Sequence, residues 1–541
     1  MTILRPFALA ATLSALLTLP ATAHHADAPA QQMGHNEAAL GTVHFETTCS
    51  AEAQPRFNRA VALLHSFWFA VAIDGFNEVL EADPACAMAE WGIAMAHWGN
   101  PLSSGRQPQM LGDGGSAVER AQAIGAKSER EGDYIAAVAH LYADHENTSD
   151  RSRGLAFETA MAALVATYPA DSEAAIFYAM ALNGTADLND KTYAKQLEAA
   201  AILEAAYDEQ PNHPGISHYL IHSYDVPALA DRAIDAARSY AAIAPAAPHA
   251  LHMPSHTFTR LGYWQESIDT NIKAAHAAIA AGSPPEALHA MDYMIYGYLQ
   301  TGQDAAAREV VGRMNEIRDG IDAGSGYGVA GFYAVAAIQA RYTLERSDWE
   351  AAANLDVLRT ATPFVDAIVY FARALGAARS GDPTRARDDM AQLGRARDTL
   401  GGNSFWATKV DIHREVAEAW IAFAEGTVDQ ALALMRRAAN REDQTEKSAI
   451  SPGPVAPARE LLGQMLLEAG RNEAALEAFQ ATIAKEPGRF RGIYGAARAA
   501  ELSGNRELAE RFYTTLLEVA ERADGGGRPE IEQARAFLTG D

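Results

Sequence analysis

The chain has 541 residues, 49% of them hydrophobic, so several domains or an elongated repeat array are expected rather than one compact core. Lys and Arg number 44 against 69 Asp and Glu, and the net charge of −25 argues against nucleic acid and anionic membrane surfaces as partners. Beyond the N-terminal segment, no uncharged apolar run reaches the length of about 18 residues that a membrane span needs, so no transmembrane segment is expected in the mature chain.

Residues 1–23 are typical of a secretory signal peptide. Arg5 precedes an apolar run from Phe7 to Leu19, and an Ala-Thr-Ala sequence ends at Ala23, after which cleavage is expected. The mature chain would then start with a flexible, histidine-containing leader over residues 24–52. These features predict an exported, periplasmic protein.

Cys49 and Cys86 are the two cysteines of the chain. In an oxidising compartment they are expected to form a disulfide, whereas two buried free thiols remain the alternative. Their spacing does not decide between the two.

From Pro55 onward the chain shows the pattern of paired helices. Small, aromatic and proline residues occupy repeating places in several units, and Gly470 and Gly504 are 34 residues apart. The residues that carry the pattern are Ala72, Phe76, Pro84, Gly262, Trp264, Ser267, Asn271, Gly470, Ala475, Phe479 and Pro487. In this the chain resembles the tetratricopeptide repeat family over most of its length, from about residue 55 to 523.

The resemblance implies an all-α superhelical solenoid of roughly eleven or twelve helix pairs. We expect an N-terminal solenoid over 53–320 and further repeats over 321–523, divided by the glycine-rich stretch near residue 325. Residues 524–541 are expected to form a tail or capping helix.

Six histidines lie between residues 212 and 256, and their spacing is regular. His218 and His252 are 34 residues apart, as are His222 and His256, so successive repeats present the same pair. Each pair is spaced i, i+4, which places both side chains on one helix face. We therefore expect the four imidazoles to converge.

In the family that the chain resembles, defined positions of the first helix of each pair line a concave groove. Carried onto this sequence, those positions predict a ligand-binding groove. Its expected residues are His218, His222, Asp225, His249, His252, His256, His289, Asp292 and Tyr296.

Three interpretations of the groove remain open. Exported proteins of this family usually act as scaffolds, so the first is a periplasmic protein that binds a peptide or protein partner. The second is a metal-binding protein or metal-dependent hydrolase, in which His218, His222, His252 and His256, with Asp225 or Asp292, hold zinc, copper or iron. The third is that the histidines and tyrosines only fill the superhelix and hydrogen-bond one another.

Overall fold

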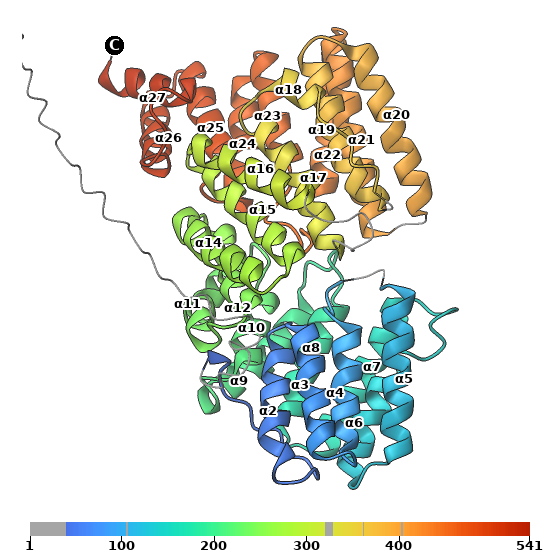
Figure 1. Ribbon diagram of the computed structural model, residues 1–541. Helices are drawn as coiled ribbons and strands as arrows, with labels where there is room; N and C mark the ends of the chain where they lie inside the picture. The colour runs from blue at the N-terminus through green and yellow to red at the C-terminus, as the bar shows by residue number, and fades with distance from the viewer. Residues whose placement is uncertain (1–38, 104–105, 320–327, 361, 402–403, 541) are drawn as a thin grey trace, which may run out of the picture.

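The computed structural model describes residues 39–103, 106–319, 328–360, 362–401 and 404–540, and within these ranges it is all-α, without a strand. Consecutive helices pack against one another in chain order, which makes the fold an α-solenoid (Figure 1). This confirms the predicted fold class, whereas the number of repeats and the tetratricopeptide assignment stay predictions.

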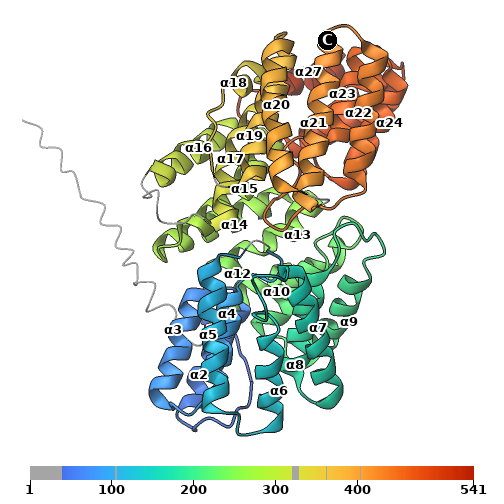
Figure 2. The same ribbon diagram turned by 90° about the vertical axis from the view of Figure 1, so that its right-hand side faces the viewer.

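The solenoid has two halves, stacked end to end in Figures 1 and 2. The first half consists of α2 (Ala53–His65), α3 (Phe69–Ala82), α4 (Ala87–Trp98), α5 (Pro108–Ile124), α6 (Glu129–Ala139), α7 (Asp150–Thr167), α8 (Ser172–Thr185), α9 (Ala194–Glu209), α10 (Pro214–Ser223), the 3-10 turn η2 (Ala230–Ala233), α11 (Ile234–Ile243), α12 (Pro248–His252) and α13 (Pro254–Leu261). It turns back on itself, so that α10 contacts α2.

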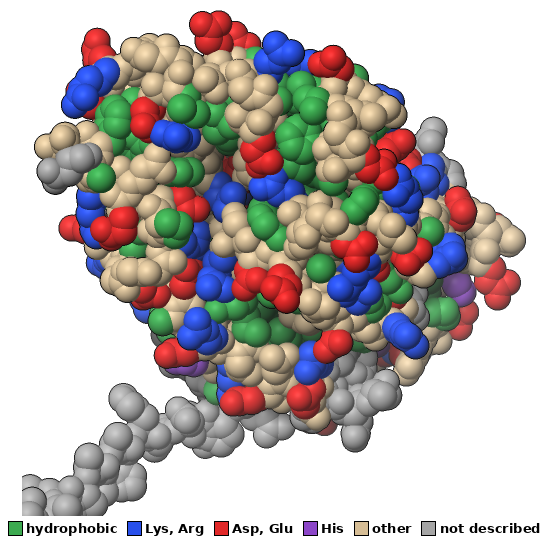
Figure 3. Space-filling model, turned by 90° about the horizontal axis from the view of Figure 1, so that it is seen from above, with side chains coloured by type: hydrophobic (Ala, Val, Ile, Leu, Met, Phe, Trp, Pro, Cys, Tyr) green, Lys and Arg blue, Asp and Glu red, His purple; other side chains and the backbone are tan. Residues whose placement is uncertain are grey.

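The second half consists of α14 (Trp264–Ala280), α15 (Pro284–Gln300), α16 (Asp304–Asp319), α17 (Gly328–Leu344), α18 (Trp349–Ala353), α19 (Pro363–Arg379), α20 (Pro383–Leu400), α21 (Phe405–Ala424), α22 (Val428–Asp443), α23 (Ala458–Glu468), α24 (Asn472–Lys485), α25 (Phe490–Leu502), α26 (Arg506–Val519) and α27 (Pro529–Thr539). It also closes on itself, because α25 contacts α15. The face of this half seen in Figure 3 carries interspersed acidic and basic side chains.

The hydrophobic core divides near residue 260 and not near residue 320. One buried cluster extends from Leu40 to Phe258, and the next begins at Ile268 and includes both Leu288 of α15 and Ile338 of α17. α15 and α17 pack directly on each other and share this core, across the boundary expected at 320/321, which stays a prediction. The glycine-rich stretch that was expected to divide the array falls largely outside the described residues.

The expected leader over 24–52 is shorter than predicted. Residues 1–38, with the expected signal peptide, lie outside the described residues, but Leu40, Val43 and Phe45 are buried in the first core. Phe45 packs edge-on against Phe57 and Trp91, with ring centroids 5.5 Å apart in each pair. Residues 39–52 are thus part of the fold, because their alternating apolar side chains are covered by the first helices.

A disulfide joins Cys49 to Cys86, with the two Cα atoms 4.9 Å apart. It fixes residues 39–52 to the turn before α4, which begins at Ala87. The backbone of Ser50 also donates to Asp83 at 2.7 Å on that turn. The N-terminal segment is therefore held both by burial and by a covalent link.

Replacing both cysteines by serine should lower the free energy of unfolding by about 2–4 kcal/mol, because the link closes a loop with a sequence separation of 37 residues. Urea unfolding of the oxidised wild type and of Cys49→Ser/Cys86→Ser measures the difference. A loss below about 0.5 kcal/mol would show that the link does not restrict the unfolded chain.

A proline shapes the helix that carries the central histidines. Pro254 has no N–H to donate to the helix, and the helix that starts at Pro248 stops at His252 and resumes at Pro254. α13 ends at Gly262, whose φ of 74° is left-handed and whose added Cβ would lie 2.7 Å from the carbonyl oxygen of Pro487.

Candidate metal centre

Six buried histidines belong to helices that lie where the two halves meet, among them α10 and α12 (Figures 1 and 2). They come from four short stretches of helix: α10, α12, α13 and the first turns of α15. The six are His218, His222, His249, His252, His256 and His289, and none is more than 9% exposed. Because every residue of α10 is buried as well, these side chains do not line a groove open to solvent. The expected open groove is therefore corrected to a closed interior cluster.

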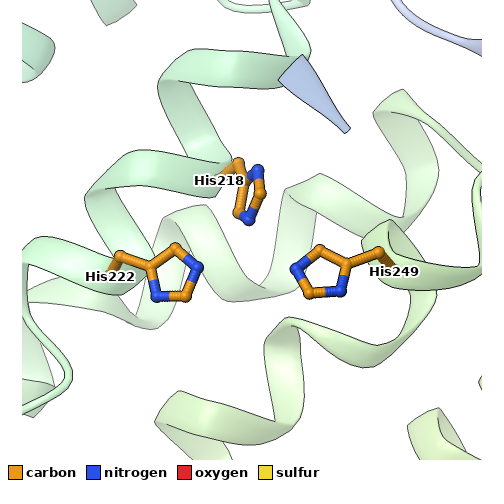
Figure 4. Close-up of side chains that lie close together, drawn as sticks. All are labelled: His218, His222 and His249. Carbon is orange, nitrogen blue, oxygen red and sulfur yellow. The ribbon is translucent and has the colours of Figure 1, made fainter. Parts of the chain in front are cut away.

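His218, His222 and His249 form the first triad. One ring nitrogen of each lies within 4.8 Å of the corresponding nitrogen of the other two. Figure 4 shows the three rings turned toward the space between them. The Nε2 atoms of all three are buried and have no hydrogen-bond partner among the described residues.

Nδ1 is the ring nitrogen that faces away from the centre of the triad. Its hydrogen-bond partner determines which of the two ring nitrogens carries the proton. His218 Nδ1 lies 2.6 Å from the carbonyl oxygen of His65, which can only accept, so Nδ1 must donate. His249 Nδ1 faces the carboxylate of Glu286 at 3.5 Å. The Nε2 atom of neutral His218 thus presents a lone pair to the centre of the triad, as a metal-ligating histidine does.

His252, His256 and His289 form the second triad, whose ligating atoms are also within 4.8 Å of one another. His252 Nδ1 lies 2.7 Å from the Asn271 side-chain oxygen, and the amide nitrogen of Asn271 donates to the Ser267 carbonyl at 2.7 Å. The Asn271 oxygen therefore accepts from His252 Nδ1.

The Nε2 atoms of His252 and His256 face each other at 3.1 Å. His256 Nδ1 donates to Asp225 at 2.9 Å, so neither neutral ring has a proton to place between the two Nε2 atoms. His289 Nδ1 is buried without a hydrogen-bond partner in the part of the chain that the structure describes. The second triad, like the first, directs lone pairs inward.

Asp225 is the carboxylate that supports the second triad. Besides His256, it accepts from Arg260 Nε at 2.9 Å and from Lys447 Nζ at 2.5 Å. Although burial acts in the opposite sense, Lys447 and Arg260 keep the pKa of Asp225 well below its ordinary value. Asp225 is therefore an ionised partner of His256 and not a member of the ligating groups, which corrects its predicted place in the metal shell.

Burial lowers the pKa of five of the clustered imidazoles. It brings the pKa of His252 and of His256 to about 3, and those of His218, His222 and His289 well below the ordinary value. Neighbouring imidazoles act in the same direction, because two cations cannot be buried side by side. These five imidazoles are therefore neutral nitrogen donors at neutral pH.

Asp292 and Tyr296 do not join the cluster. Asp292 accepts from Arg341 Nε at 2.8 Å, and the Tyr296 hydroxyl accepts from Arg489 at 2.8 Å. On α15, residues 289 and 293 share one face, whereas 292 and 296 share the next face around the helix. The predicted metal ligand Asp292 is thus wrong in register, and its neighbour Tyr293 is the residue that packs on His252, with ring centroids 4.7 Å apart.

The segment between α22 and α23 covers the cluster. Lys447 reaches Asp225, and the Tyr293 hydroxyl donates to the Ser451 carbonyl at 3.0 Å. Glu446 accepts from Lys191 of the first half at 2.5 Å. Residues distant in sequence therefore complete the wall, and no periodic pattern in the sequence could have indicated them.

A third buried group lies behind the first triad. The Glu173 carboxylate is 3.0 Å from His65 Nε2 and 2.9 Å from His213 Nε2, and the Tyr219 hydroxyl is 2.9 Å from His65 Nδ1. Glu173 pairs with the Nε2 atoms of both imidazoles, whereas His213 Nδ1 is buried without a hydrogen-bond partner among the described residues. The group supports the first triad, because the carbonyl oxygen of His65 accepts from His218 Nδ1. Glu173 was not anticipated, since 108 residues separate it from His65.

The comparison with protein-family models finds no match to this chain, and the comparison with curated proteins finds none either. In the described ranges, no helix combines the length and the apolar character that crossing a bilayer requires.

Proposed function

We propose that the protein binds a transition-metal ion, zinc, copper or iron, through the Nε2 atoms of His218, His222 and His249. The observation that carries the proposal is the convergence of three buried Nε2 atoms that have no hydrogen-bond partner among the described residues. Leaving a buried polar atom unpaired costs about 1–3 kcal/mol, so three at one point are costly unless a cation binds them. Of the three interpretations given above, we thus favour metal binding. The proposed ligands differ from the predicted four histidines, because His249 joins His218 and His222 in place of His252 and His256.

The donor set defines the chemistry of the ion. Three imidazoles hold zinc at about 2.0–2.1 Å and leave one position of a tetrahedral shell for water or a substrate. An ion bound this way would lower the pKa of a bound water and permit hydrolysis. Metal-dependent hydrolysis is therefore compatible with the site, whereas a peptide ligand would need access that the buried imidazoles do not offer.

We also propose that the protein is exported and that its helix pairs are of the tetratricopeptide type. Export is supported by the signal-like residues 1–23 and by the disulfide between Cys49 and Cys86, a link typical of oxidising compartments. Cell fractionation with an antibody to the chain should place it outside the cytoplasm, and a cytoplasmic chain with free thiols would contradict this.

The metal content of the protein, purified without chelators, tests the proposed site. We expect at least one ion per chain in the wild type and none in His218→Gln/His249→Gln at the same folded fraction, measured by elemental analysis and circular dichroism. The matched control is His413→Gln, because the Nδ1 atom of His413 is also buried without a hydrogen-bond partner among the described residues, but this imidazole stands alone, stacked on Phe371. An unchanged ion content in the double variant would overturn the proposal.

A further inference from the structure

The two triads abut, so ions bound to them would be neighbours. The ring centroids of His222 and His256 are 5.6 Å apart, and those of His249 and His252 are 5.9 Å apart. His249 and His252 belong to the same short helix, α12, and serve different triads. Rings of the two triads are therefore direct neighbours.

The geometry of the second triad also favours a bound cation. His252 and His256 each donate their Nδ1 proton outward, to Asn271 and to Asp225, so two Nε2 lone pairs face each other at 3.1 Å. Two lone pairs at this separation repel. Two nitrogens bound at about 2.0 Å to one tetrahedral ion lie roughly 3.3 Å apart, close to the separation seen here.

The ligand chemistry discriminates between metals. Neither triad contains a thiolate or a carboxylate, so six neutral imidazoles would carry no charge of their own. Imidazole sites bind copper more tightly than the other first-row divalent ions, and a buried neutral site favours the singly charged Cu(I). Lys447 and Arg260 lie next to the second triad, and their positive charges also disfavour an ion of higher charge. The carboxylate of Asp225 offsets part of the charge of these two side chains.

Building on the metal-binding function proposed above, we propose that the two triads hold a coupled pair of copper ions that binds dioxygen. In the reduced state each triad holds one Cu(I). When O2 binds between them, each ion gives up one electron, both become Cu(II), and O2 is reduced by two electrons to a bound peroxide, with no proton transferred. A cavity lined by Tyr333, Lys447 and Ser451 lies beside the segment that covers the cluster, and Lys447 also contacts Asp225.

The test loads the full-length, metal-free protein with Cu(I) without air and then admits O2. We expect two copper ions per chain, uptake of one O2 per two ions, and an oxidised form without an electron paramagnetic resonance signal, because the two Cu(II) spins cancel. His252→Gln/His289→Gln should bind one ion and show the signal of isolated Cu(II), and His413→Gln should match the wild type.

The possible outcomes separate the two proposals. No bound copper and no other bound metal would overturn the metal-binding function itself. One ion per wild-type chain, or a proton shared by His252 and His256 in place of the second ion, would overturn the pair and leave the first site standing. Two ions with independent spin signals, or two zinc ions with no uptake of Cu(I), would overturn the coupled copper pair. Thermal unfolding of each variant checks that the loss of an ion is not a loss of fold.

Discussion

Removing the bound ion with a chelator is expected to lower the free energy of unfolding of the wild-type protein by about 4 kcal/mol, compared with protein at a free-ion concentration 1,000-fold above the dissociation constant. The folded chain places three Nε2 atoms within 4.8 Å of one another, whereas the unfolded chain has no such site. Urea unfolding with and without the chelator measures the difference.

The control for this prediction is the variant that lacks the first triad. His218→Gln/His249→Gln should unfold at the same urea concentration in the presence and absence of the chelator, whereas His413→Gln should respond as the wild type does. If the wild type shows no stabilisation by zinc, copper or iron at any concentration, the unpartnered nitrogens are tolerated by the fold and have no metal to bind.

Replacing Arg341 by methionine is expected to cost about 3–5 kcal/mol of stability, because it leaves the carboxylate of Asp292 buried without its partner. Both side chains are fully buried, and Arg341 Nε lies 2.8 Å from Asp292 Oδ1. Arg341 also donates to the carbonyl oxygens of Gly453 and Pro454 at 2.8 and 2.9 Å, so the segment that covers the histidines would lose its anchor as well.

Two further variants give this prediction its controls. Arg313→Met removes an exposed ion pair with Glu316 at 2.7 Å, and it should cost less than about 1 kcal/mol. Arg341→Met/Asp292→Leu removes both buried charges and should recover much of the loss. A single Arg341→Met variant as stable as Arg313→Met would show that Asp292 is not charged in the folded protein, and equal losses in the single and double variants would assign the cost to the carbonyl contacts.

The sequence carries enough information to predict the helical array and the convergence of the central histidines. The 34-residue spacing relates His218 to His252 and His222 to His256, and the structure brings all four into one cluster. The 34-residue spacing does not show which imidazoles converge on the same metal site. His249 completes the first triad, whereas His252 of the same short helix belongs to the second, a division that the spacing alone cannot give.

The rest of the site depends on contacts between distant residues. Glu173 and Lys447 reach the site from parts of the chain far away in sequence, and each is one polar residue among many in its own helix or loop. Asn271 lies 19 residues from His252, but nothing in the sequence pairs their side chains. The misplacement of Asp292 has a simpler cause. The repeat register applied to α15 selected residues 289, 292 and 296, whereas the helix turns 289 and 293 toward the cluster.

The most direct test of the central claim is X-ray diffraction from crystals of the protein, measured at the absorption edge of the metal that it contains. We predict an anomalous peak about 2.0–2.1 Å from the Nε2 atoms of His218, His222 and His249. Ordered density that shows these three rings in place with no anomalous peak between them, or a peak bound only by surface carboxylates, would contradict a metal centre in this protein.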